Sequence, residues 1–117
     1  MALRKAMERL TKPIEELDRA ALERYCDELG ATPMSQITAR TPIRVAGEVR
    51  AVTIVPRAGA PALEVSVSDG RGSVVAVFLG RRKIAGMSPG RRVLLTGVAG
   101  RDGKRFIVYN PEYTLLG

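Results

Sequence analysis

The sequence predicts a mainly β protein in which one amphipathic α-helix precedes a small β module. From Thr41 to Leu116, apolar and polar residues alternate with a period of two, interrupted by turns rich in glycine, proline and aspartate. Nearer the N-terminus the apolar residues recur instead at three- and four-residue spacing, which is typical of a helix. We therefore expect three parts: a helical segment at residues 1–30, a connector at 31–42 and a β domain at 43–117.

The N-terminal segment predicts a helix over residues 12–29. Thr11 can cap its start, Pro13 suits its first turn, and Gly30 follows its last apolar residue. Residues 2–10 are expected to form a separate short helix or a frayed arm. The helix has an apolar stripe made of Ile14, Leu17, Ala21, Tyr25 and Leu29. We expect this stripe to pack on the β module or on a second copy of itself, with a different protein as the other alternative.

The first three strands are predicted from alternation and turn residues. The first strand runs from Ile43 to Pro56, and the second and third cover Leu63 to Ser68 and Ser73 to Leu79. The first strand buries the face formed by Ile43, Val45, Gly47, Val49 and Ala51. The turn Asp69-Gly70-Arg71-Gly72 joins the other two strands. If its first and last residues face each other, Leu63 lies opposite Phe78, which then points toward the core.

The second half of the β module is predicted as a closing hairpin. Residues 80–87 are too polar for a strand and fit a one- or two-turn helix or a loop. The fourth strand, Val93 to Ala99, turns at Asp102-Gly103 into a fifth, Arg105 to Asn110. A turn centred there sets Arg101 opposite Lys104. It also places Phe106 and Val108 in the core, puts Arg105, Ile107 and Tyr109 on the outer face, and leaves Pro111 to Leu116 as a short closing segment.

This order of elements predicts an OB-fold, a five-stranded Greek-key β-barrel, here preceded by the amphipathic helix. The alternative fold is an SH3-like barrel. That fold lacks the long first strand and the insert between the third and fourth strands, so the OB-fold is preferred.

The positive charge is concentrated in the β module. Residues 31–117 hold 13 basic and five acidic residues, a net charge of +8, whereas residues 1–30 hold six and seven, a net charge of −1. Such a bias in a compact β domain is the electrostatic pattern expected for a phosphate-rich partner. Nucleic acid is therefore the leading hypothesis.

Several classes of site are excluded by composition. The absence of histidine excludes imidazole bases and nucleophile pairs that use them. Cys26 is the sole cysteine, which excludes an intrachain disulfide and a Cys-rich metal site and indicates a buried or half-buried reduced thiol. We expect no enzyme, no cofactor and no metal. The enzymatic alternative is a small metal-dependent nuclease, which would require Glu48 and Glu64 to converge across adjacent strands.

The sequence also predicts a cytoplasmic protein with no membrane partner. No apolar run approaches the roughly 20 residues that a membrane-spanning helix needs. The N-terminal residues lack the apolar stretch of a secretory signal.

Short motifs of the β module resemble those of OB-fold nucleic-acid-binding proteins. In chain order they are Val45-Ala46-Gly47-Glu48-Val49, Asp69-Gly70-Arg71-Gly72-Ser73-Val74, Val77-Phe78-Leu79, Pro89-Gly90, Val93-Leu94-Leu95-Thr96-Gly97-Val98 and Asn110-Pro111-Glu112-Tyr113. Residues 41–116 are similar to the wedge domain of the RecG-type branch-migration helicase, whose barrel also ends in a Pro-Glu-Tyr element. No helicase motor is present. The resemblance therefore implies contact with single-stranded or branched nucleic acid, in DNA repair or recombination. Because the β module has few aromatic residues for base stacking, we expect little sequence preference.

That family binds nucleic acid on the face of strands two and three, between two flanking loops. The resemblance thus implies a binding site formed by Arg50, Arg57, Arg81, Arg82, Lys83, Arg101, Lys104, Arg105 and Tyr109. Guanidinium groups suit phosphate oxygens and stack on bases, and Tyr109 is the best candidate for base stacking. The alternative is a protein-interaction OB-fold that docks, through its helix or its barrel, on a larger nucleic-acid-processing complex.

Overall fold

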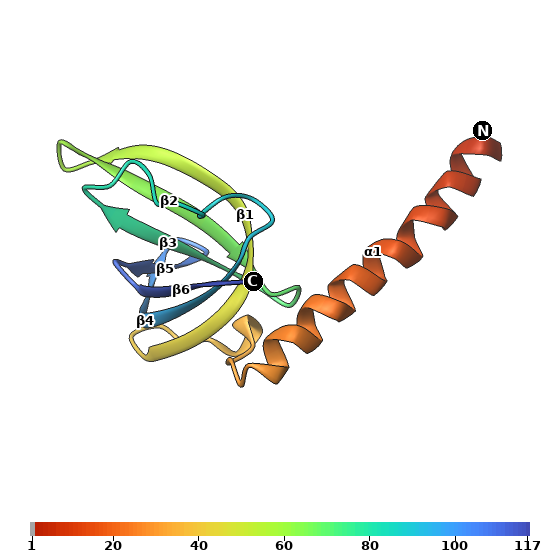
Figure 1. The fold of residues 1–117 in the computed structure, drawn as a ribbon, viewed down its shortest axis with the longest axis horizontal. Helices are drawn as coiled ribbons and strands as arrows, with labels where there is room; N and C mark the ends of the chain where they lie inside the picture. The colour runs from red at the N-terminus through yellow and green to blue at the C-terminus, as the bar shows by residue number, and fades with distance from the viewer. Residues whose placement is uncertain (1) are drawn as a thin grey trace.

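The computed structural model describes the backbone of residues 2–117 and the side chains of residues 14–117. A long helix extends away from a β module built on a strongly curved sheet (Figure 1). The protein is mainly β. Its elements in chain order are α1 (Ala2–Glu28), the 3-10 turn η1 (Met34–Gln36), β1 (Pro42–Arg57), β2 (Ala60–Ser68), β3 (Ser73–Leu79), β4 (Arg92–Asp102), β5 (Arg105–Tyr109) and β6 (Glu112–Leu116).

Helix α1 begins earlier than predicted. It runs continuously from Ala2, so Thr11 is not an N-cap, Pro13 lies in the helix interior, and residues 2–10 are neither a separate helix nor a frayed arm. Residues 2–12 consist mostly of strong helix formers, whose preference favours continuing the helix through the proline. The predicted stop is confirmed, because Gly30 follows the helix with a positive φ of 70°.

The last turns of α1 pack on the β module. Leu22 and Cys26 are buried against Ala46 of β1, with Tyr25 and Leu29 partly buried beside them. Burial raises the pKa of the Cys26 thiol to about 11, and its Sγ donates to the carbonyl oxygen of Ala46 at 3.3 Å. The buried thiol predicted from the sequence is therefore confirmed. It stays protonated at neutral pH.

The β2–β3 turn also holds the helix. The guanidinium of Arg71 donates to both carboxylate oxygens of Asp27, at 2.7 and 2.9 Å. Earlier in the helix the predicted stripe is uncovered, because Ile14 and Leu17 are 60% and 65% exposed. The β module therefore covers only the C-terminal part of this stripe.

Within residues 2–117, six strands form one sheet in the order β1-β2-β3-β5-β4-β6, and an additional β1–β4 pairing closes the sheet into a ring. The β3–β5 pairing is parallel and all the others are antiparallel. The segment predicted to close the chain forms a sixth strand, so the expected count of five was too low. Strand β1 occupies one edge of β4, which leaves the opposite edge for β6.

A β-bulge divides β1. The pairing register with β2 shifts between Val49 and Ala51, so Arg50 is the extra residue. Beyond the bulge the two faces exchange: Val52 packs against the core and Ala51 is exposed. The prediction that Ala51 continues the buried face was therefore wrong, because an extra residue reverses a period-two pattern.

The predicted register is confirmed for one hairpin and wrong for the other. In β2–β3, Leu63 lies opposite Phe78 and Phe78 is buried, as predicted. In β4–β5, Arg101 lies opposite Phe106 rather than Lys104, because the turn is centred on Gly103 and Lys104. The partner of each residue thus moves by two positions, which leaves the faces unchanged. The inward position of Val108 and the exposure of Tyr109 are consequently as predicted.

The core lies inside the ring. It includes buried residues from every strand of the ring, and partly buried Phe106 packs against it. Met34 and Ile37 of the connector belong to it, as do Ile84 and Met87 of the segment after β3, which is a loop and not a helix. Ile107 was predicted to lie on the outer face of β5. On that face it is buried in an apolar cluster with Ala62 and Val77, separate from the main core. No helix among the described residues is long and apolar enough to cross a membrane.

Candidate nucleic-acid interface

A groove of about 320 Å³ lies on the outer side of the ring, against strands β1, β2 and β3 and the β4–β5 hairpin. Because side chains alternate along a strand, the same pattern that buries Leu63 and Val65 directs their neighbours Glu64 and Ser66 outward. The residues that line the groove are Ala51, Thr53, Glu64, Ser66, Ser73, Val75, Lys104, Arg105 and Phe106.

Two predicted arginines meet at the carboxylate of Glu64. Nη2 of Arg57, at the end of β1, donates to Oε2 at 3.0 Å, and Nη1 of Arg105 lies 3.5 Å from Oε1. The hydrogen bond that Arg57 donates to Glu64 raises the pKa of Arg57, so its positive charge is retained. The Glu64 side chain is only 14% exposed. A carboxylate in this position offsets part of the positive charge that the sequence places on this face.

Tyr109 stands at the end of β5 on the same outer face. It is 51% exposed, its hydroxyl lies 3.3 Å from Nη1 of Arg57, and the guanidinium carbon lies 5.7 Å from the ring centroid. This contact is within the range of a cation–π interaction. Arg57 therefore links the carboxylate of Glu64 to the exposed aromatic ring.

The β4–β5 hairpin supplies the remaining positive charges. The guanidinium carbon of Arg101 lies 5.0 Å from the centroid of Phe106, and Lys104 lines the groove. Arg105 also donates to Asp102 at 3.0 Å. Lys104 has no ion pair among the described residues, so its ammonium group is the lining cation most available to a ligand.

Of the predicted site residues, Lys104 and Arg105 line this groove, whereas Arg57, Arg101 and Tyr109 lie beside it and the others lie elsewhere. Arg81, Arg82 and Lys83 are exposed in the loop after β3. The start of this loop lies beside the start of β2, because the amide of Gly80 donates to the carbonyl oxygen of Pro61 at 2.8 Å. These three side chains are not among the residues that line the groove.

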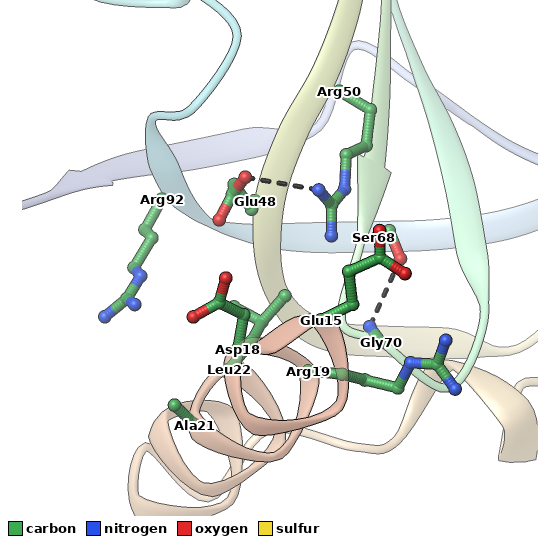
Figure 2. A pocket seen from close by; sticks show the side chains of 10 residues that line it. All are labelled: Glu15, Asp18, Arg19, Ala21, Leu22, Glu48, Arg50, Ser68, Gly70 and Arg92. Atoms are coloured by element: carbon green, nitrogen blue, oxygen red, sulfur yellow. Dashed lines mark hydrogen bonds and ion pairs between the residues drawn. The ribbon is translucent and has the colours of Figure 1, made fainter. Parts of the chain in front are cut away.

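Arg50 belongs to a different pocket, of about 770 Å³, between α1 and the β module. Figure 2 shows Arg50 and Glu48 from β1 and Glu15 and Asp18 from α1 extending into this space. Arg50 donates to Glu48 at 3.3 Å. The pocket is lined by as many arginines (Arg19, Arg50 and Arg92) as carboxylates, so it lacks the positive bias of a phosphate site.

The two candidate nuclease carboxylates lie apart. Glu48 pairs with Ser68 across the sheet, whereas Glu64 pairs with Thr53, and the two acids line separate pockets. Within residues 14–117, no three acidic or cysteine side chains gather in a way that could hold a metal ion.

Some lining residues were not identified as site residues from the sequence. Thr53, Ser66, Ser73 and Val75 carry no distinctive motif, although the alternation of β2 already put Glu64 and Ser66 on the polar face. Their common position becomes visible only once the pairing of β1, β2 and β3 is known.

No protein-family model matches this sequence. A search of curated proteins finds no significant match either.

Proposed function

We propose that this chain is a non-enzymatic OB-fold protein that binds single-stranded or branched DNA with little sequence preference, in DNA repair or recombination. The observation that carries the proposal is the position of the groove. It lies on the outer side of β2 and β3 and is bordered by the β4–β5 hairpin. OB-folds bind oligonucleotides on this same face, between the β1–β2 and β4–β5 loops.

The strand pairings support the OB-fold. Support comes from the antiparallel β1–β2–β3 meander, the parallel β3–β5 pairing and the return through β4 to β1, because an OB-fold is a five-stranded Greek-key barrel. Strand β6 is an addition to that plan. The resemblance of residues 41–116 to the wedge domain of the branch-migration helicase favours single-stranded or branched DNA over other nucleic acids.

The chemistry of the groove favours backbone contacts over base reading. Lys104 and Arg105 line the groove and offer charged donors to phosphates. Beside it, Arg57 and Arg101 contact its lining residues Glu64 and Phe106, and Tyr109 offers an exposed surface for stacking. Stacking and phosphate contacts tolerate any base. We therefore expect modest, strongly salt-dependent binding with little sequence preference.

A protein-interaction module that docks on a larger nucleic-acid-processing complex is the second candidate. It is favoured by the pairing of Arg57 and Arg105 with Glu64, which reduces the charge free for phosphate, and by the exposure of Ile54 and Val98, at 56% and 59%. Exposed apolar side chains on strands are more useful for contacting protein than for contacting phosphate.

The function is tested by titrating labelled single-stranded, duplex and forked DNA and single-stranded RNA of equal length, at low and at near-physiological salt. We expect single-stranded and forked DNA to bind best, with log K falling linearly with log salt by about 0.7 per phosphate contact. Arg101→Ala with Lys104→Ala should flatten this slope, whereas the matched pair Arg19→Ala and Arg24→Ala on α1 should not. Absence of binding at low salt contradicts the proposal. Binding lost near 0.15 M salt, together with a stable protein partner, favours the second candidate.

Replacing Glu64 by glutamine is expected to raise DNA affinity several-fold and to steepen the salt dependence. The substitution removes the negative charge that holds Arg57 and Arg105, so each guanidinium becomes free for one phosphate, worth about 0.7 in slope. Fluorescence anisotropy over a salt series measures both quantities. Glu48→Gln is the control, because it makes the same charge change in the other pocket. A loss of affinity in Glu64→Gln would instead mean that the carboxylate itself contacts the ligand.

A further inference from the structure

The exposed part of helix α1 carries an apolar stripe that no other described residue covers. Ile14 and Leu17 are 60% and 65% exposed, whereas the buried apolar packing on the β module involves Leu22 and Cys26 of later turns. In Figure 1 the helix leaves the β module and extends away from it. We infer that this stripe is a dimer interface, at which two copies of the chain pair their α1 helices in antiparallel orientation.

The spacing of apolar residues supports a helix pair. In the sequence, spacings of four and three alternate along Leu3, Met7, Leu10, Ile14, Leu17 and Ala21. This is the heptad pattern, which lets two helices pack along one continuous seam. The next two positions of the pattern are Arg24 and Glu28, so the pattern ends where α1 begins to pack on the β module.

The order of charges identifies a second copy as the partner and sets its orientation. Residues 3–11 hold three basic residues and one acidic residue, a net charge of +2. Residues 13–21 hold one basic and three acidic residues, a net charge of −2. Antiparallel pairing centred on residue 12 places each basic half beside an acidic half, whereas parallel pairing places like charges together.

The same charge order is unfavourable for an unpaired helix. Acidic residues stabilise the first turn of a helix and basic residues the last, but α1 has neither. Pro13 also removes one backbone hydrogen bond from its interior. An antiparallel partner offsets the unfavourable positive charge at the start of the helix, because its acidic half lies against the basic N-terminal half.

The pairing leaves room for both β modules. The end of α1 lies 16 residues from the midpoint of the pair, so the two modules are separated by roughly 50 Å along the helix axis, at about 1.5 Å per residue. They therefore stand at opposite ends of the helix pair. The dimer does not depend on the function proposed above. If both grooves bind DNA, however, one long strand could engage both and be held more tightly than by a single module.

The dimer is tested by sedimentation equilibrium of the full chain from micromolar to near-millimolar concentration. We expect the mass to rise from 12.6 kDa toward twice that value, with weaker association at high salt. Leu17→Glu should keep the protein monomeric but folded, because that side chain is exposed in the single chain. Arg19→Glu, on the opposite side of the helix, should still dimerise. A mass that stays at 12.6 kDa, a limiting mass above two copies, or a dimer that survives Leu17→Glu would overturn the inference.

The orientation is tested by disulfide cross-linking between two single-cysteine substitutions. In the antiparallel pair, residue 17 of one copy faces residue 7 of the other, whereas the two residues 17 lie about 15 Å apart, too far for a disulfide. An equimolar mixture of Leu17→Cys and Met7→Cys should therefore cross-link far more than either variant alone. The unmodified chain controls for Cys26. Efficient self-cross-linking of Leu17→Cys would overturn the antiparallel arrangement.

Discussion

Replacing Asp69 by alanine is expected to lower the free energy of unfolding by about 2 to 4 kcal/mol, because backbone amides would lose their acceptor. Asp69 is a buried polar residue, at 2% exposure. Its Oδ2 accepts from the amide of Met34 at 2.7 Å, and its Oδ1 accepts from the amides of Arg71 and Gly72 at 2.9 and 3.0 Å. One side chain thus closes the β2–β3 turn and fixes the connector. Thermal unfolding should show a drop of roughly 10 to 30 °C.

Two further substitutions separate this role from other contacts of the turn. Arg71→Ala removes the partly exposed ion pairs to Asp27 and Glu23 and should cost no more than about 1 kcal/mol. Asp69→Asn should fall between the two, because its amide nitrogen cannot accept from Met34 while its oxygen still accepts from the turn. Arg71→Ala could leave the melting temperature within 2 °C of that of the unsubstituted chain. If Asp69→Ala also changes it by no more than this, the buried carboxylate does not organise this end of the β module.

The parts of the fold that were predictable from the sequence are those set by local signals. The turn at Asp69-Gly70 fixes the register of β2–β3, and the alternation of β2 fixes its buried face. The turn after β4 is ambiguous, because Asp102-Gly103 and Gly103-Lys104 are both acceptable turn centres. The structure uses the second. This choice moves each pairing partner by two residues. The predicted register was therefore wrong, but the predicted face of Tyr109 was right.

The bulge and the sixth strand depend on contacts that no local signal encodes. Arg50 becomes the bulge residue because β1 pairs with β4 through its first half and with β2 through its second. Strand β6 forms because β4 has an edge left free by β1. Both features follow from closure of the ring, which the sequence does not specify residue by residue.

In the candidate site, too, some features follow from local sequence patterns and others depend on how the strands pair. Exposure of Tyr109 and the position of the basic β4–β5 hairpin follow from local pattern. The ion pairs that join Arg57 and Arg105 through Glu64 bring together side chains from three strands, so they require the pairings β1–β2, β2–β3 and β3–β5 at once. Composition correctly placed the positive charge in this module but could not show that a carboxylate partly neutralises it.

Replacing Tyr109 by alanine is expected to cost about 1 to 3 kcal/mol of single-stranded DNA affinity, equivalent to roughly 5- to 150-fold, if a base stacks on its ring. The ring is half exposed and its contacts to Arg57 are at the surface, so the melting temperature should change little. Tyr109→Phe keeps the ring but loses the hydroxyl contact to Arg57, and it should retain most of the affinity. Anisotropy titrations and thermal melts of both variants measure the two effects.

A buried neighbour on the same strand and face provides the matched control. Ile107 is 1% exposed beneath this surface, so Ile107→Ala should cost about 2 to 5 kcal/mol of stability while leaving the stacking ring in place. Phe106→Ala should affect both properties, because its ring packs against the core and also lines the groove under Arg101. If Tyr109→Ala binds DNA as tightly as the unsubstituted chain, stacking does not occur at this end of β5. Binding would then depend on the charged β4–β5 hairpin alone, and the salt slope should account for all of the affinity.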